Sequence, residues 1–100
     1  MDLQNVTQLL IDQKRQLQTF GLRKIGIFGS LARGQEQKTS DVDLLLDFEP
    51  SQKNYKNFFA GVSFLERLLN RSVDAVTPQA ISPYLKPHID KDITYVQISN

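Results

Sequence analysis

The sequence predicts a small α/β (α+β) fold, in which helices pack against a mixed β-sheet. Two observations predict it. Short apolar runs of strand length alternate along the chain with longer stretches of helical periodicity. Their order, helix, strand, short helix, strand, helix, strand, helix, fits a layered arrangement. With 100 residues, of which 40% are hydrophobic and 23% charged, the chain has the size and composition of one globular domain, residues 1–100.

The net charge and the cysteine content argue against several classes of function. The net charge of +1 argues against a basic track for nucleic acid, so we expect no direct nucleic-acid binding. The absence of cysteine excludes disulfides and thiolate chemistry. The N-terminus lacks the regions of a signal peptide, and no apolar run approaches membrane-spanning length. We therefore expect a cytoplasmic protein without a membrane partner.

The N-terminal third predicts a helix, a strand and a short helix. Apolar residues recur at helical spacing over Val6–Phe20, and Gly21 follows as a stop. The apolar run Lys24–Phe28 is long enough for one buried strand. Ser30 has the chemistry of an N-cap for a short helix, which Gly34 closes.

The middle of the chain predicts a second strand and a long helix. The strand covers Val42–Phe48, and the polar loop that follows contains a proline. An apolar stripe over Phe58–Leu69 predicts the helix, with Asn70 as its C-terminal cap. Because Phe58 and Phe59 are adjacent, both cannot face inward, and one of them is available to a partner.

Three further elements are expected in the C-terminal part. Ser72–Thr77 predicts a third strand, and Pro83–Ile89 predicts a short helix with Ser82 as its cap and Pro87 as a limit or kink. The alternation in Ile93–Ile98 is typical of a strand, whose pairing the sequence leaves open.

A turn suited to phosphate follows the first strand. Gly29 allows the backbone to approach a bulky anion closely, and the hydroxyl of Ser30 stands beside it. A helix that starts here aims free N–H groups at the same anion. Arg33 either neutralises phosphate charge or only solvates a helix end.

A pair of carboxylates stands at the start of the second strand. Asp41 and Asp43 are two residues apart, so both project to one face, opposite Val42 and Leu44. Two hard oxygen ligands on one face suit magnesium, which also uses water and substrate phosphates.

These residues carry a resemblance. Gly29-Ser30-Leu31-Ala32-Arg33-Gly34, followed by Ser40-Asp41-Val42-Asp43-Leu44, resembles the motif of the DNA polymerase beta-like nucleotidyltransferase superfamily, and within it the minimal nucleotidyltransferase (MNT) domains. The resemblance implies the polymerase beta-like fold. It also implies an antitoxin that transfers AMP from ATP to a tyrosine of a HEPN-domain ribonuclease toxin.

The resemblance further implies a third carboxylate on a neighbouring strand. Asp74 is the candidate, since burial of a lone carboxylate among Val73, Ala75 and Val76 would be costly unless a metal or partner compensated it. The expected mechanism places two magnesium ions on Asp41, Asp43 and Asp74, with attack of a hydroxyl on the α-phosphate.

Two other functions remain open: an antitoxin that masks its partner by binding alone, and a nucleotidyltransferase that modifies a small molecule. The remaining polar residues have plainer interpretations. We interpret Asp47 as a strand-end charge, His88 as a surface residue, and Tyr84 and Tyr95 as packing residues.

Overall fold

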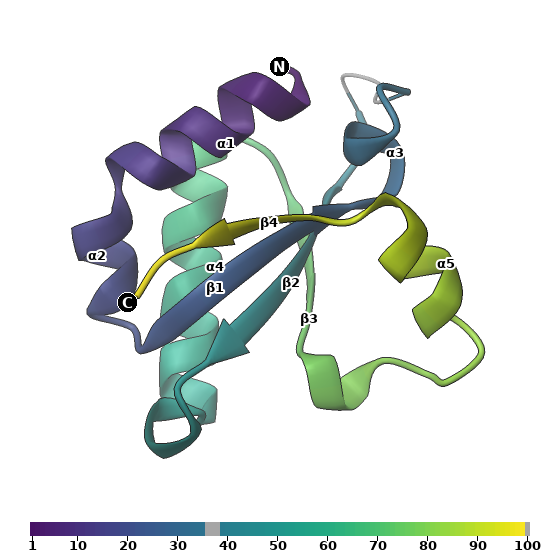
Figure 1. The fold of residues 1–100 in the computed structure, drawn as a ribbon. Coiled ribbons are helices and arrows are strands. Elements are labelled where there is room, and N and C mark those ends of the chain that lie inside the picture. The colour runs from purple at the N-terminus through teal and green to yellow at the C-terminus, as the bar shows by residue number, and fades with distance from the viewer. Residues whose placement is uncertain (36–38, 100) are drawn as a thin grey trace.

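The protein is built on one four-stranded mixed sheet with the strand order β3-β2-β1-β4 (Figure 1). The computed structural model describes residues 1–35 and 39–99. β1 pairs antiparallel with both β2 and β4, and β2 pairs parallel with β3. The C-terminal strand, whose pairing the sequence left open, thus lies at one edge. The strands are β1 (Leu22–Phe28), β2 (Val42–Phe48), β3 (Val73–Val76) and β4 (Thr94–Gln97).

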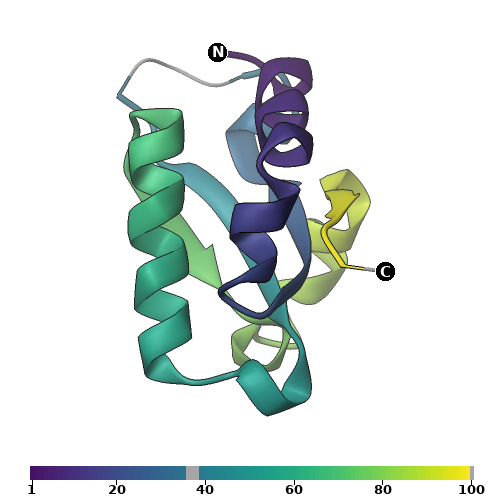
Figure 2. The same ribbon diagram turned by 90° about the vertical axis from the view of Figure 1, so that its left-hand side faces the viewer.

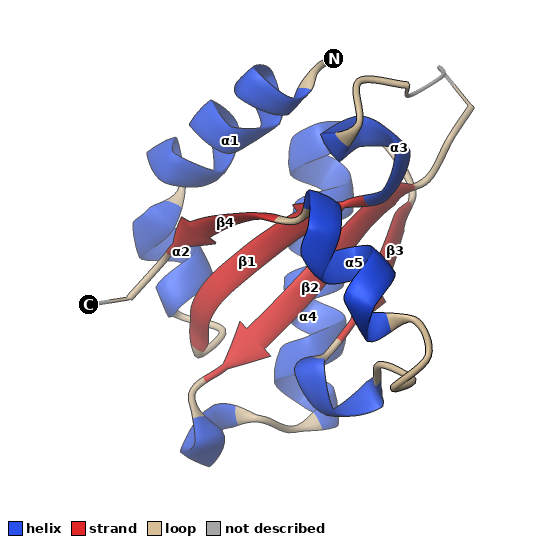
Figure 3. Cartoon of the chain, turned by 45° about the vertical axis from the view of Figure 1, so that its right-hand side comes forward, coloured by secondary structure: helices blue, strands red, loops and turns tan. Residues whose placement is uncertain are grey.

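Helices cover the two faces of the sheet unequally. Figure 3 shows α4 behind the sheet and α5 in front of it, and Figure 2 shows the same separation from the side.

None of the helices in the described part of the chain is long and apolar enough to span a membrane. The helices are α1 (Leu3–Asp12), α2 (Lys14–Gln18), α3 (Gly29–Ala32), α4 (Tyr55–Leu69) and α5 (Lys86–Asp92), and two 3-10 turns are η1 (Pro50–Gln52) and η2 (Pro78–Ala80).

The core lies on one face of the sheet, which we name the core face. Ile25 and Ile27 of β1 stand opposite Leu46 and Leu44 of β2, and all four are fully buried. Each such side chain contributes about 1.5–3 kcal/mol by leaving water. Helices α1, α2 and α4 add the buried side chains that pack against them: Val6, Leu10, Leu17, Leu65 and Leu69.

The opposite face, which we name the outer face, is more polar. Because side chains alternate along a strand, Asp43, Leu45 and Asp47 of β2 point away from the core face. Lys24 stands opposite Asp47, and Asp43 stands opposite Asp74 of β3. The outer face therefore carries the carboxylates that the sequence singled out.

The first predicted helix is two helices. α1 ends at Asp12 and α2 begins at Lys14, because Gln13 leaves helical geometry at φ −109° and ψ 20° and its N–H bonds to the carbonyl of Leu10. The bend leaves both Leu10 and Leu17 fully buried.

The helix predicted over Pro83–Ile89 is wrong in its limits. The residues after Ser82 form a turn, in which the carbonyl of Ser82 accepts from the N–H groups of Leu85 and Lys86. α5 begins only at Lys86 and continues to Asp92. Pro87 stands in its first turn, where no N–H is required, and so neither limits nor kinks it.

Smaller differences concern single side chains. Tyr84 is 88% exposed, so its interpretation as a packing residue is wrong. Tyr95 is also exposed, with its ring under the ammonium group of Lys24. The left-handed conformation of Asn70, with φ 53°, confirms the predicted end of α4. Of the two adjacent phenylalanines, Phe59 faces outward.

Candidate active site

The chain turns at Gly29, directly after β1. Gly29 has φ +73°, a conformation that favours glycine. A Cβ at this position would collide with the carboxylate of Asp43. The two residues meet because Phe28 stands opposite Asp43 in the β1–β2 pair. The glycine therefore leaves space for a carboxylate as well as for the anion that the sequence suggested.

The predicted N-cap role of Ser30 is wrong. α3 begins at Gly29, its N-cap is Phe28, and no side chain caps it. The positive φ of Gly29 starts the helical turn one residue earlier than the sequence suggests, so Ser30 lies inside the first turn. Its hydroxyl therefore makes no cap bond with α3. Gly34 follows the helix with φ +71°, and its N–H bonds to Leu31 as predicted for a closing residue.

Asp41 and Asp43 stand at the beginning of β2. Val42 and Leu44 between and beside them are buried on the core face, so the alternation of the strand directs Asp43 to the outer face. Asp41 precedes the strand and is exposed, whereas Asp43 is partly buried. The separation of the two carboxylates from Val42 and Leu44 agrees with the sequence.

Asp74 is brought beside Asp43 by the parallel pairing of β2 and β3. The register places the two residues directly opposite each other. Asp74 is exposed, because β3 is an edge strand, so the argument from the cost of its burial is wrong. What supports Asp74 as a member of the site is instead the strand register, because the Cβ atoms of cross-strand neighbours lie about 5 Å apart.

The three carboxylates act on one another electrostatically. Partial burial raises the pKa of Asp43 above its usual value, and the charges of Asp74 and Asp41 raise it further. The guanidinium of Arg33 opposes this rise in the pKa. Asp43 is thus the centre of an acidic cluster that a bound cation would stabilise.

Arg33 lies between the acidic cluster and α5. Its Nη1 is 3.6 Å from a carboxylate oxygen of Asp92, and its Nε donates to Oε1 of Gln35 at 3.3 Å. The side chain of Arg33 is 46% exposed, so these contacts are weak. It can therefore exchange Asp92 for another anion at small cost.

Sequence comparison agrees with this geometry. Residues 10–96 match the model of the nucleotidyltransferase domain family. The chain belongs to the nucleotidyltransferase domain family. It is 34% identical over 97 residues to the protein adenylyltransferase MntA of Thermococcus cleftensis, a match that covers 96% of this chain and 97% of that protein. It is 31% identical over 97 residues to the Methanocaldococcus jannaschii protein MJ1379, named as a candidate protein adenylyltransferase, with 94% and 97% covered.

Solved structures place the chain among the minimal nucleotidyltransferases. A structure described as a candidate minimal nucleotidyltransferase superposes with a TM-score of 0.69 at 28% identity, covering 94% of this chain and 95% of the other. The fold is also shared with a chain from a complex of a tri-AMPylated Shewanella oneidensis HEPN toxin and its MNT antitoxin. That match has a TM-score of 0.60 at 18% identity and covers 89% of this chain and 70% of the other. The predicted resemblance and fold are confirmed.

Metal binding in this family member would need ligands beyond the protein. Within residues 1–35 and 39–99, no three carboxylate or imidazole side chains are grouped closely enough to form a metal site by themselves. Magnesium does not require such a cage, since it commonly binds one or two carboxylates together with water and substrate phosphates. The mutual repulsion of Asp41, Asp43 and Asp74 fits a cation that arrives with its nucleotide.

The sequence did not reveal the contacts of two aspartates near the outer face, Asp92 and Asp47. Asp92 contacts Arg33 only because α5 packs near α3, and no local motif marks it. Asp47 stands one residue before the end of β2, as the sequence suggested, but it is buried, 7% exposed, and paired with Arg23. The sequence shows basic residues in β1 and acidic residues in β2, but which of them pair is fixed only by the sheet register.

Proposed function

We propose that this nucleotidyltransferase is an antitoxin that transfers AMP from ATP to a tyrosine of a HEPN-domain toxin. The observation that carries the proposal is the position of Asp43 beside the Gly29 turn, opposite Asp74 and within the electrostatic influence of Asp41. The names of the relatives support the reaction class, and the complex of an MNT antitoxin with an AMPylated HEPN toxin supports the partner.

The triphosphate would bind where the Gly29 turn and the acidic cluster meet. The first N–H groups of α3 have no partner inside so short a helix, and they can donate to phosphate oxygens. The hydroxyl of Ser30 can donate to the same group. Arg33 would leave Asp92 and pair with a phosphate, for which its guanidinium is well suited.

Asp41, Asp43 and Asp74 would hold two magnesium ions, which bring the triphosphate to the carboxylates and offset the charge that develops during transfer. Asp74, an exposed carboxylate on the edge strand, is assigned to the acceptor side, where it would help to take the proton from the tyrosine hydroxyl. The hydroxyl oxygen forms a bond to the α-phosphorus as the bond to the bridging oxygen breaks, and pyrophosphate leaves. Ser30, Arg33 and the backbone amides of α3 would stabilise the negative charge of the leaving pyrophosphate.

The openness of the site favours a protein acceptor. Asp74 lies on an edge strand and Asp41 outside the sheet, and both are exposed. Because both carboxylates are open to solvent, a small acceptor bound beside them would lack a covering layer. A docked protein can supply this layer and fix the hydroxyl, which makes the transfer effectively intramolecular.

Intact-mass spectrometry tests the proposal. The purified chain, the HEPN-domain protein of the same genome and magnesium ATP are mixed, with Asp41→Asn and Asp43→Asn in parallel. We expect the HEPN protein to gain one or more AMP units with the wild type and none with either variant. Fragmentation of the product should place AMP on tyrosine.

Three results would contradict the proposal. A stable complex with no mass gain would assign neutralisation by binding alone. AMP on an added small molecule, with none on the HEPN protein, would instead identify a nucleotidyltransferase that modifies small molecules. Transfer that persists in Asp43→Asn would refute the role of the carboxylates.

A further inference from the structure

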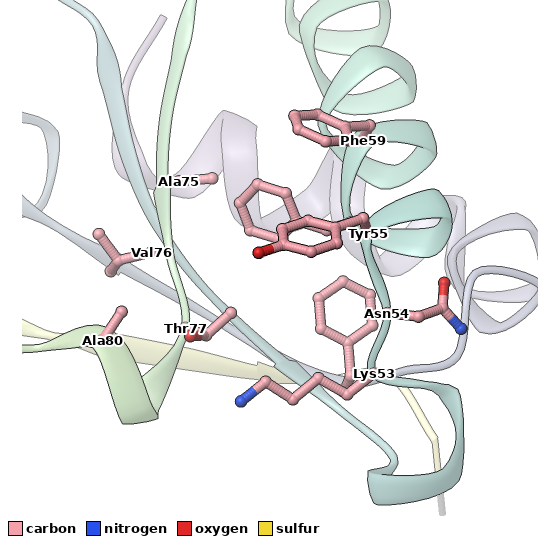
Figure 4. A pocket seen from close by; sticks show the side chains of 10 residues that line it. Lys53, Asn54, Tyr55, Phe59, Ala75, Val76, Thr77 and Ala80 are labelled. Carbon is pink, nitrogen blue, oxygen red and sulfur yellow. The ribbon is translucent and has the colours of Figure 1, made fainter.

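An apolar groove lies between the beginning of α4 and the edge strand β3, and its lining includes Ala75, the residue that follows Asp74 in β3. It has a volume of about 470 Å³. Figure 4 shows Tyr55 pointing from α4 towards β3, with Ala75 and Val76 on the other wall. At one end the Nζ of Lys53 donates to Oε1 of Gln79 at 2.7 Å. The groove thus runs along β3, with the Lys53–Gln79 hydrogen bond at the end away from Asp74.

Two aromatic rings on its α4 wall are unusually open to solvent. Tyr55 is 82% exposed and Phe59 is 62% exposed, and their rings stack with centroids 6.2 Å apart. Phe59 also meets the edge of Phe58, which packs against the core. Phe59 is therefore supported by a partly buried neighbour, and Tyr55 stacks on Phe59, as in surfaces where aromatic side chains anchor a partner.

The other wall presents free backbone groups. The N–H of Val42 bonds to the carbonyl of Ser72, and the N–H of Val73 turns the other way, to a carboxylate oxygen of Glu66. Since a strand alternates the direction of its backbone groups, Ala75 also directs its N–H and C=O away from β2. An open strand edge of this kind pairs readily with another extended chain.

We propose that the outer edge of β3 and this groove bind an extended segment of the acceptor protein, which guides the acceptor hydroxyl to Asp74. This inference rests on the proposed transfer function. The segment would pair with Ala75 through its backbone and place apolar side chains against Tyr55 and Phe59, as in the addition of a strand to a sheet edge.

Continuity with the acidic cluster favours the acceptor as the occupant. Asp74 and Ala75 are consecutive, and strand residues rise about 3.3 Å each, so a segment in the groove ends within a few residues of the cluster. A second copy of this chain fits less well. Antiparallel pairing about Ala75 would bring two exposed Asp74 carboxylates within about 8 Å of each other, with no basic residue on either β3 strand to offset their charge.

Binding of the HEPN-domain protein to the chain, measured by calorimetry, tests the inference. The variant Tyr55→Ser/Phe59→Ser changes exposed side chains only, and Ala75→Pro removes the outward N–H without removing a bond to β2. We expect each to weaken the complex by about tenfold or more. Binding of a non-hydrolysable ATP analogue should stay at the wild-type level, which also shows that each variant is folded.

Tyr84→Ser is the matched control, because Tyr84 is as exposed as Tyr55 but lies outside the groove, in the turn before α5. Wild-type affinity in both groove variants, or an equal loss in the control, would overturn the inference. So would a change from dimer to monomer with unchanged affinity for the HEPN protein, which would assign the groove to a second copy.

The same samples separate this inference from the proposed function. AMP transfer is followed by intact mass alongside binding. If the wild type binds its partner but never transfers AMP, the proposed function fails while the groove measurement stands. If transfer occurs and the groove variants bind and transfer normally, the groove inference fails and the proposed function stands.

Discussion

Asp43 and Asp47 stand on the same face of the same strand, but their surroundings differ. Asp47 is almost fully buried, and its two carboxylate oxygens accept from Nη2 of Arg23 at 3.0 and 3.1 Å. Asp43 is partly buried, faces Asp74 and lies near Asp41, so that burial first and the two neighbouring charges next raise the pKa of Asp43. The neighbouring strands therefore decide whether a carboxylate stabilises the sheet or is left for a ligand.

The largest expected effect separates the two residues by activity. Asp43→Asn should lower AMP transfer by about 100-fold or more, because it removes charge that would face the metal and nucleotide. Asp47→Asn should transfer at the wild-type rate, since Arg23 and not the nucleotide is its partner. Initial rates at saturating ATP measure both. Equal losses in the two variants would remove the distinction between the two ends of β2.

The space around Asp43 can be tested through Gly29. Gly29→Ala should destabilise the chain by about 1–3 kcal/mol and lower transfer, because it adds strain at a positive φ and a clash with Asp43. Gly34→Ala is the control, since its φ is also positive but a Cβ there meets no atom within 4 Å. Urea unfolding should find Gly29→Ala the more damaging. Equal stability of the two variants would contradict the close approach.

The structural role of Asp47 can be tested from its partner. Arg23→Met should lower the free energy of unfolding by about 1–3 kcal/mol, because it leaves a buried carboxylate without its donor. Lys86→Met breaks an exposed pair with Asp90 and should leave stability unchanged. Urea unfolding compares the two. A loss no greater in Arg23→Met than in Lys86→Met would show that Asp47 is not held by Arg23.

The smallest effect concerns the pH dependence of the free chain. The pKa of Asp43 is raised above 3.8 in the folded chain, so the folded state holds its proton to higher pH than the unfolded state does. The wild type therefore loses stability relative to Asp43→Asn as pH rises through the raised pKa. At neutral pH without magnesium, Asp43→Asn should be the more stable by less than about 1 kcal/mol. If Asp43→Asn were less stable than the wild type at neutral pH without magnesium, the result would contradict a raised pKa of Asp43.

The sequence was sufficient for the local features of this comparison. The alternation in Val42–Phe48 predicted which side chains share a face, and the break at Gly29 predicted the turn. It was misleading where backbone geometry decides. Ser30 has the chemistry of a cap, but the positive φ of Gly29 starts α3 before it. Nothing in the side chains marks Gln13 as the end of α1.

The contacts between segments that are distant in the sequence could not be predicted from it. Arg23 and Asp47 meet through the β1–β2 pair, and Arg33 meets Asp92 only when α5 has packed. Asp74 was the candidate for the third carboxylate that the resemblance implies. Its expected burial, which supported that choice, is wrong, and the parallel register is what places it beside Asp43. That residues 1–100 form one domain, and that it is cytoplasmic, stay predictions.

Calorimetry of a non-hydrolysable ATP analogue tests the central claim most directly, because it needs no acceptor. Wild type, Asp43→Asn and Asp47→Asn are titrated with and without magnesium. We expect magnesium-dependent binding in the wild type and in Asp47→Asn, with at least about tenfold weaker binding in Asp43→Asn. Binding that is indifferent to magnesium, or unchanged in Asp43→Asn, would contradict the assignment of this end of β2 to the metal-bound nucleotide.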